Sequence, residues 1–331
     1  MGATTHDLFG RTPRAEPATP GSYGAPPRGA YRLPDATRLG PVRLQVADLA
    51  RSLAFYERVL GLRVLENGPD RAALGAQPSA TGGGRALVEL HERPGARPAP
   101  TRPGAAGGRL GLYHFALLLP DRPALGRFVR HLAGLGVRAG AGDHLVSEAF
   151  YLNDPDGLGI EVYADRPRST WQRAGRELMM ATDPVDVAGL AAAAGDAPWA
   201  GMPAGTEMGH VHLHVGDLDR AAAFYADALG FDRMVWHYPG ALFLGAGGYH
   251  HHLGANTWAG AGARAPGDDD ARLLEWTLEL PSAAEVERAA ASLAAAGYAA
   301  ERDGADLVVR DPWGTTLRVA TPAGAPASAL G

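Results

Sequence analysis

The chain has 331 residues, a formal net charge of −5 and 46% hydrophobic residues, a balance typical of one large globular domain or two smaller ones. Because the net charge is negative and gives no sign of a basic nucleic-acid-binding surface, we expect no nucleic-acid partner. The sequence has no cysteine and no lysine, which excludes thiolate nucleophiles, cysteine metal sites, disulfides and lysine Schiff bases.

The N-terminal part of the chain is rich in proline and glycine, and this composition predicts a disordered tail over 1–38. A second short tail is expected over 322–331. The N-terminal stretch lacks the apolar core of a signal peptide, and no apolar run is long enough to span a bilayer. We therefore expect a cytoplasmic protein without membrane contact.

An internal repeat organises the remainder of the chain. The segment GPVRLQVADLARSLAFYERVLGL (40–62) aligns without gaps with GHVHLHVGDLDRAAAFYADALGF (209–231), and 12 of the 23 positions are identical. Each segment begins with strict alternation of apolar residues, which predicts a half-buried strand, and continues through an Asp-Leu turn into a helix. Gly61 and Gly230 follow at the position where a helix C-cap favours glycine.

A second, weaker pair of segments has the same strand, turn and helix pattern, since 114–137 resembles 275–298. Each is followed by a closing segment, DPDGLGIEV (154–162) in one and DPWGTTLRV (311–319) in the other. The chain therefore divides into four units, each with an opening strand and helix and room for about three short strands. The predicted units are 39–92, 110–165, 207–258 and 272–321.

The units resemble those of the vicinal oxygen chelate superfamily, whose βαβββ modules open with H-V-x-L-x-V-x-D-L…A-F-Y…L-G-F and close with D-P-x-G-x-x-x-E. The four-unit layout over about 40–320 is similar to that of the extradiol catechol dioxygenases. The segments GLYHFALLLP, SEAFYLNDPDGLGIEVYADRPRSTWQR, MGHVHLHVGDL and GGYHHHLGANTW resemble specifically the bacterial catechol-2,3-dioxygenase branch. This resemblance implies an α+β fold in which four βαβββ modules form two cupped mixed β-sheets with flanking helices.

In that superfamily the metal ligands come from the first and last strands of each unit. The family's spacing places His114 and His210 at the first-strand position of units two and three, and Glu161 at the last-strand position of unit two. The resemblance therefore implies a facial triad of two histidines and one carboxylate, the ligand set of non-haem iron(II) oxygenases. Fe(II) is the expected cofactor, and Mn(II), Zn(II) and Ni(II) are the alternatives.

The corresponding last-strand position of unit three falls at His252, to within one residue. The resemblance leaves two roles open for His252, a fourth metal ligand or an acid–base group that touches no metal. If GGYHHHLGANTW forms a strand, period-two alternation places His250 and His252 on one face and His251 on the other. We therefore interpret His251 as a structural residue and His250 as a second acid–base candidate.

Two further residues are predicted to act beside the metal. Tyr151 lies ten residues before Glu161, the spacing at which the resemblance implies a tyrosine that hydrogen-bonds a substrate oxygen. His144 precedes that strand on a loop, where a neutral imidazole can shuttle the catechol proton. With His250 and His252, these are the predicted catalytic residues.

The implied activity is metal-dependent extradiol cleavage of catechol or a substituted catechol by dioxygen, in a monomer or a homodimer. Two alternatives remain open. A glyoxalase-like isomerase or lyase on the same fold is favoured by a four-ligand set that includes His252. A non-catalytic small-molecule-binding protein of the resistance kind lacks the ligands, so the residues retained here argue against it.

The equivalent ligand positions in units one and four hold Pro41, Glu89, Glu275 and Arg318. A guanidinium has no lone pair to offer a metal, so these two units make a poor metal site. Pairing unit two with unit three, and one with four, gathers the strong ligands into one cup and leaves a metal-free cup in which a Glu–Arg pair can form. The linker 166–206, with a short helix predicted over 185–194, is long enough for this crossed arrangement.

Overall fold

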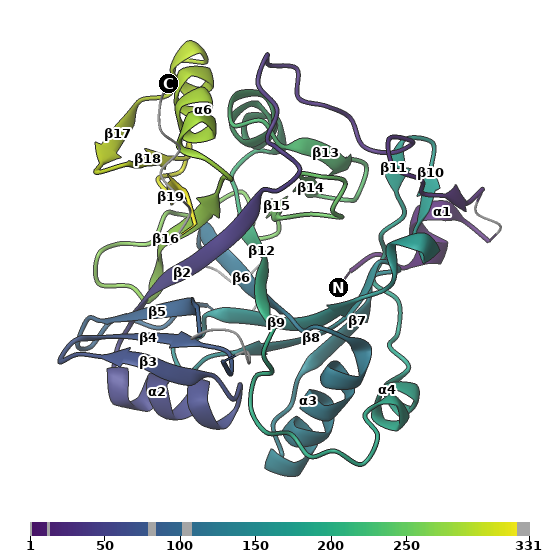
Figure 1. The fold of residues 1–331 in the computed structure, drawn as a ribbon, viewed down its shortest axis with the longest axis vertical. Helices are drawn as coiled ribbons and strands as arrows, with labels where there is room; N and C mark the ends of the chain where they lie inside the picture. The colour runs from purple at the N-terminus through teal and green to yellow at the C-terminus, as the bar shows by residue number, and fades with distance from the viewer. Residues whose placement is uncertain (1, 12–13, 79–83, 101–107, 323–331) are drawn as a thin grey trace.

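The protein consists of two large β-sheets with helices packed on their outer faces (Figure 1). The computed structural model describes residues 2–11, 14–78, 84–100 and 108–322. Each of the four repeat units forms one strand, one helix and three further strands. The predicted fold class, α+β with paired βαβββ modules, is confirmed.

One eight-stranded sheet, the 1–4 sheet, is built from the two ends of the chain. Unit one contributes β2 (Arg38–Val46), α2 (Leu49–Arg58), β3 (Arg63–Asn67), β4 (Arg71–Gly75) and β5 (Ala86–Glu92). Unit four contributes β16 (Arg272–Glu279), α6 (Ala283–Ala295), β17 (Ala300–Asp303), β18 (Asp306–Arg310) and β19 (Thr316–Ala320). The strand order is β17-β18-β19-β16-β2-β5-β4-β3.

The other eight-stranded sheet, the 2–3 sheet, is built from the middle of the chain. Unit two contributes β6 (Gly111–Leu118), α3 (Arg122–Leu135), β7 (Gly140–Asp143), β8 (Ser147–Asn153) and β9 (Gly159–Asp165). Unit three contributes β12 (Glu207–His214), α5 (Leu218–Ala221) with a π-helical continuation (Ala222–Ala228), β13 (Asp232–Val235), β14 (Ala241–Gly245) and β15 (Leu253–Asn256). The strand order is β13-β14-β15-β12-β6-β9-β8-β7.

The first strands of the units form the centre of each sheet. β6 pairs antiparallel with β12 in the 2–3 sheet, and β16 pairs antiparallel with β2 in the 1–4 sheet. The crossed pairing predicted from the charges at the ligand positions is therefore confirmed. It brings the strands that carry His114, Glu161 and His210 into one sheet.

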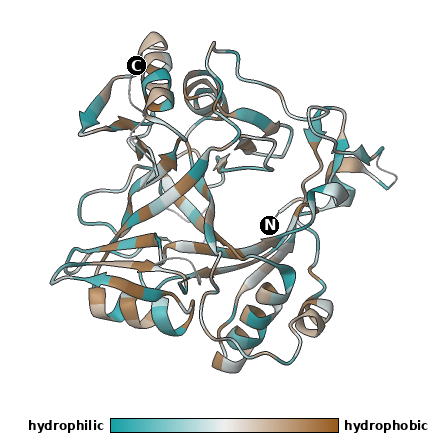
Figure 2. Cartoon of the chain, viewed as in Figure 1, coloured by the Kyte–Doolittle hydropathy of each residue, from teal (hydrophilic) through white to brown (hydrophobic). Residues whose placement is uncertain are grey.

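Each unit's helix begins at the turn that the repeat predicts. The side chains of four residues accept a hydrogen bond from the backbone N–H three residues later and so cap the helix N-terminus: Asp48, Asp121, Asp217 and Ser282. Gly61 and Gly230 follow two of the helices with φ of 75° and 102°, a conformation that favours glycine. Bands of hydrophobic and hydrophilic residues alternate along the strands and helices (Figure 2). Among the described residues, no helix combines the length and the apolar character needed to cross a bilayer.

The linker 166–206 contains more secondary structure than the single helix predicted for it. It contains a 3₁₀ turn (Arg168–Thr170), the hairpin of β10 (Gln172–Ala174) and β11 (Glu177–Leu178), and α4 (Val187–Ala193). α4 lies within the segment 185–194, where a helix is predicted, and packs against α3. The tail predicted over 322–331 lies outside the described residues apart from Pro322.

The structure differs from the disordered tail predicted over 1–38. A short helix, α1 (Thr5–Phe9), is followed by β1 (Glu16–Pro17), which pairs with β10 of the linker. Ala25 exchanges backbone hydrogen bonds with Arg233 on β13. The physical reason is that prolines already restrict this segment, so docking costs it little conformational freedom, and its backbone groups find partners on the linker and on β13.

Two matching hydrogen bonds join the two sheets. The tyrosine of each A-F-Y motif donates to the aspartate of a D-P-x-G turn: Tyr56 to Asp154 at 3.2 Å and Tyr225 to Asp311 at 2.8 Å. All four side chains are buried. Each bond links one unit of the 1–4 sheet to one unit of the 2–3 sheet, so the repeat that defines the units also fixes how the sheets meet.

We expect Tyr56→Phe and Tyr225→Phe each to lower the free energy of unfolding by about 1–3 kcal/mol, because a buried carboxylate loses a hydrogen-bond donor. Urea denaturation of the metal-free protein measures the change. The control is Tyr298→Phe, whose ring lies 4.8 Å from that of Phe224 and whose hydroxyl has no hydrogen bond to any described residue. Equal stability of the control and the two variants would contradict the assigned bonds.

Candidate metal centre

Three buried side chains from three strands of the 2–3 sheet meet at one point. His114 lies on β6, Glu161 on β9 and His210 on β12. The Nε2 atoms of His114 and His210 each lie 3.0 Å from Oε2 of Glu161 and 3.3 Å from each other. In the described part of the chain, this is the one group of at least three His, Asp or Glu side chains whose ligand atoms all lie within 4.8 Å.

The register of the three strands explains why these side chains converge. His210 lies opposite Ala116 in the antiparallel β6–β12 pair, and Ala116 lies beside Glu161 in the parallel β6–β9 pair. His114 is two residues from Ala116 and therefore projects from the same face of β6. The small, buried side chain of Ala116 leaves room above the sheet for all three ligands.

The charge states of His114 and Glu161 suit metal binding. Burial lowers the pKa of His114, and Glu161 offsets this only in part. Burial alone would raise the pKa of Glu161, but the rings of His210 and His114 outweigh it and hold this pKa well below its usual range. A neutral imidazole and an ionised carboxylate are the forms that coordinate a metal.

The donor separations fit a divalent metal with three protein ligands. Ligand atoms about 2.1 Å from an octahedral ion and at right angles to each other lie about 3.0 Å apart. The observed separations are 3.0, 3.0 and 3.3 Å. Two imidazoles and one carboxylate, without a thiolate, suit first-row ions such as Fe(II), Mn(II) and Zn(II).

Unit three leaves the fourth ligand position without a side chain. Ala116 pairs with Glu161 in unit two, and the equivalent pair in unit three is His212 and Gly254. The His212 ring covers Gly254, since a Cβ added there would lie 2.7 Å from Cγ of His212. The site therefore has three protein ligands, and the four-ligand set considered for a glyoxalase-like enzyme is not formed.

His252, predicted as a fourth ligand or an acid–base group, does not belong to the group formed by the three ligands. Its ring packs beside Tyr249 and Phe231, with centroids 5.0 and 6.2 Å away. Its Nδ1 accepts a hydrogen bond from the backbone N–H of Ala246 at 3.2 Å. Burial lowers the pKa of His252 to about 3, so the ring stays neutral.

The segment GGYHHHLGANTW, in which His252 is predicted at the last-strand ligand position, is not a strand throughout, and that position belongs to Gly254. Gly247 and Gly248 have φ of 59° and 68° and form a turn, and β15 begins only at Leu253. The three histidines lie between the turn and the strand, where period-two alternation does not apply. The Gly-Gly pair was the signal in the sequence that indicated a turn.

His251, interpreted as structural, is the histidine of the triplet that reaches the site. Its ring centroid lies 4.1 Å from that of His210 and 5.0 Å from that of Phe243. Burial and the neighbouring His210 and His250 lower the pKa of His251 well below its usual range. His250 lies between His251 and Asp165. Its Nδ1 is 2.7 Å from Nδ1 of His251, and its Nε2 is 2.9 Å from Oδ1 of Asp165.

Tyr151 and His144 lie together on β8 and the loop before it. The Tyr151 hydroxyl is 2.5 Å from Nε2 of His144, whose Nδ1 is 2.6 Å from the carbonyl oxygen of Ala181. Tyr151 lies opposite Glu161 in the β8–β9 pair, and its ring centroid is 5.5 Å from that of His114. Burial and Glu161 raise the pKa of Tyr151 well above its usual value, so the phenol keeps its proton.

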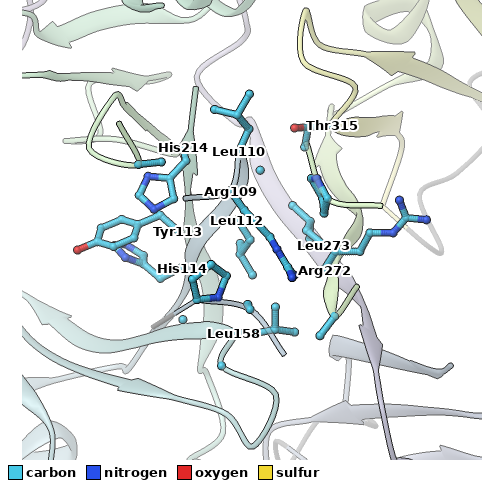
Figure 3. Close-up of a pocket in the computed structure, with 18 of the residues that line it drawn as sticks. Arg109, Leu110, Leu112, Tyr113, His114, Leu158, His214, Arg272, Leu273 and Thr315 are labelled. Carbon is cyan, nitrogen blue, oxygen red and sulfur yellow. The ribbon is translucent and has the colours of Figure 1, made fainter. Parts of the chain in front are cut away.

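A cavity of about 550 Å³ adjoins the site and runs between the two sheets. Tyr113, His114, Tyr151 and His214 line its end at the site. Figure 3 shows the labelled Tyr113, His114 and His214 on one wall and Arg272, Leu273 and Thr315, from the 1–4 sheet, on the other. Its size suits a small organic ligand.

The equivalent cup of the 1–4 sheet holds ion pairs. Arg318 occupies the position that Glu161 has in unit two, and its Nε donates to Glu275 at 2.8 Å. Arg43 donates to Glu89 at 2.9 Å on the neighbouring strands. The Glu–Arg pair predicted for this cup is confirmed, and the cation of Arg318 disfavours a metal there.

Among known protein families, the chain matches the one described as the Glyoxalase/Bleomycin resistance protein/Dioxygenase superfamily over residues 38–162 and 207–319. It is 46% identical over 280 residues to a Bacillus subtilis (strain 168) protein named catechol-2,3-dioxygenase, a match that covers 83% of this chain and 94% of that protein.

Two solved structures share the architecture. A candidate dioxygenase from Bacillus subtilis has a TM-score of 0.60 at 13% identity, with 88% of this chain and 87% of that chain covered. A variant of glyoxalase I from Zea mays has a TM-score of 0.50 at 18% identity, with 86% of this chain and 92% of that chain covered. At these identities the likeness shows the fold alone.

Gly254→Ala is expected to lower the free energy of unfolding by about 1–3 kcal/mol, because the His212 ring has to move away from the new Cβ. In a His212→Ala background the same change should cost much less, since the obstructing ring is gone. A double-mutant cycle measured by chemical denaturation of the metal-free protein tests this coupling. An equal cost in both backgrounds would show that His212 does not occupy the space above Gly254.

Proposed function

Because the chain belongs to the glyoxalase/bleomycin resistance protein/dioxygenase superfamily, we propose that it is a metal-dependent extradiol dioxygenase that opens the ring of catechol or a substituted catechol beside its hydroxyls. The observation that carries this proposal is the convergence of His114, Glu161 and His210, with donor atoms 3.0–3.3 Å apart in a buried cup. The name of the 46% identical relative, catechol-2,3-dioxygenase, supports the same activity.

His114, Glu161 and His210 would hold one divalent metal. Two imidazoles and one carboxylate are the ligand set of iron(II) oxygenases, so Fe(II) is the metal we propose. When bound, it supplies open coordination positions for the diol and for dioxygen and lowers the pKa of the diol hydroxyls. The adjoining cavity is the space we assign to the ring and its substituents.

Tyr151 would orient the substrate, and His144 sets the direction of its hydroxyl. The carbonyl of Ala181 can only accept, so Nδ1 of His144 donates to it, and Nε2 accepts the O–H of Tyr151. The phenol oxygen of Tyr151 then has lone pairs free to accept a hydrogen bond from a diol hydroxyl. In this arrangement Tyr151 touches the substrate and His144 acts through Tyr151.

His251 would receive a proton from the diol. Its neutral ring lies against that of His210, on the side of the site opposite β8. A neutral imidazole beside the metal ligands can accept a proton, although the lowered pKa of His251 makes it a weaker base than an exposed histidine. We therefore assign to His251 the acid–base role for which His252 was a candidate.

A glyoxalase-like isomerase is the second candidate function. It was favoured by a fourth protein ligand, and Gly254 stands where that ligand would be. The likeness to maize glyoxalase I shows the fold alone and favours neither reaction. The retained ligands argue against a non-catalytic binding protein.

His114→Ala should reduce the metal content of anaerobically purified protein from about one ion per chain to background, because one of three ligands is lost. Elemental analysis measures the content. His237→Ala is the matched control, since this imidazole is 82% exposed and should leave the metal in place. Stoichiometric metal in His114→Ala would refute the assigned ligand set.

Tyr151→Phe should slow turnover of catechol by about 10²-fold or more while metal stays bound, because a substrate-orienting hydrogen bond is lost. The yellow ring-fission product, followed by absorbance in air-saturated buffer, reports the rate. The proposed function itself fails if iron-loaded protein leaves catechol and its simple alkyl and aryl derivatives unchanged in oxygen. That result would promote the isomerase.

A further inference from the structure

A chain of hydrogen bonds runs from the end of β9 to the cup. Asp165, whose side chain is 25% exposed, lies at one end, and His251 lies at the other, against His210. His250 bridges them, with 2.9 Å from its Nε2 to Asp165 and 2.7 Å from its Nδ1 to Nδ1 of His251.

We propose that Asp165 and His250 are positioning residues that fix the tautomer of His251 and leave Nε2 of His251 as a bare proton acceptor facing the cup. The use made of that acceptor rests on the proposed dioxygenase function. The tautomer itself follows from the geometry of these three side chains.

The direction of each hydrogen bond follows from the chemistry of the carboxylate. Asp165 can only accept, so Nε2 of His250 donates to it. With its ring proton on Nε2, His250 has a lone pair at Nδ1, so Nδ1 of His251 donates to it. That donation places the ring proton of His251 on Nδ1 and leaves the lone pair on Nε2. The Tyr249 hydroxyl also lies 3.4 Å from the same Asp165 oxygen.

Packing holds the bridge in one orientation. His250 has no exposed surface, and its ring centroid lies 4.1 Å from that of Tyr249 and 5.5 Å from that of Trp171. A ring flip would remove both hydrogen bonds in an environment without solvent to replace them. His250 therefore transmits the acceptor character of Asp165 to His251 without contacting the substrate.

No described residue makes a hydrogen bond to Nε2 of His251, and this atom is not among the fully enclosed polar atoms of the described residues that lack a partner, so it keeps some exposed surface. The rings nearest to that of His251 belong to His210, His250 and Phe243. A fixed tautomer keeps every molecule ready to take a diol proton, whereas a free imidazole would divide its population between two forms.

The direct test is long-range ¹H–¹⁵N correlation NMR on protein labelled with ¹⁵N-histidine and loaded with Zn(II), which is diamagnetic. We expect His251 to show a protonated Nδ1 and a bare Nε2. A protonated Nε2 on His251 in the wild-type protein would overturn the proposal. This readout does not depend on turnover, so a protein with the expected tautomer and no activity on catechol would contradict the proposed function alone.

Two variants test the chain from either end. His250→Phe keeps a buried ring but removes the acceptor for Nδ1 of His251, and Asp165→Asn replaces the obligate acceptor with a group that can also donate. In both, the bare-Nε2 signal of His251 should weaken or disappear. In the iron-loaded His250→Phe variant, kcat for catechol should fall by about 10²-fold while KM and metal content stay within about threefold.

The matched control is Tyr249→Phe, which removes the second donor to Asp165 and leaves the His250–Asp165 bond in place. It should retain the wild-type tautomer and kcat. Loss of the bare-Nε2 signal in Tyr249→Phe, or its persistence in His250→Phe, would overturn the assignment of His250 as the bridge.

Discussion

The antiparallel pairing of β6 with β12 is the contact on which the site depends. It joins the first strands of units two and three and places His210 opposite Ala116, next to Glu161 on β9. A shift of one residue in this pairing would turn the ligands of one strand to the other face of the sheet, because side chains alternate. Main-chain hydrogen bonds therefore set the positions of the three ligands relative to one another.

The sequence was sufficient to predict the units, the fold class and the three ligands. The repeat located each opening strand and helix, and the chemistry of Arg318 was enough to choose between two ways of pairing the units. This inference worked because a guanidinium cannot replace a carboxylate at a metal. The same reasoning did not locate the last-strand ligand position of unit three. The strand register places Gly254 at that position, and the His212 ring covers it.

The remaining differences between the expectations and the structure have a common physical cause, which is tertiary contacts that sequence patterns do not reveal. The proline-rich N-terminus has no periodicity, yet β1 pairs with β10. His251 was interpreted as structural because alternation was extended across the Gly247–Gly248 turn, beyond the strand that obeys it. Asp165 was not predicted as a site residue because its partner, His250, lies 85 residues away in the sequence, between β14 and β15, and approaches only when units two and three share a sheet.

The order of the units along the chain has a consequence for biosynthesis. Units two and three are consecutive, so the sheet that holds the ligands can close once β15 has left the ribosome. Unit one is made first but completes its sheet only with β16, which is among the last strands synthesised. Until then the edge of β2 lacks its partner and the apolar side chains of unit one stay partly uncovered. Unit one therefore keeps an unpaired strand edge through most of synthesis, while the sheet that holds the ligands can already be complete.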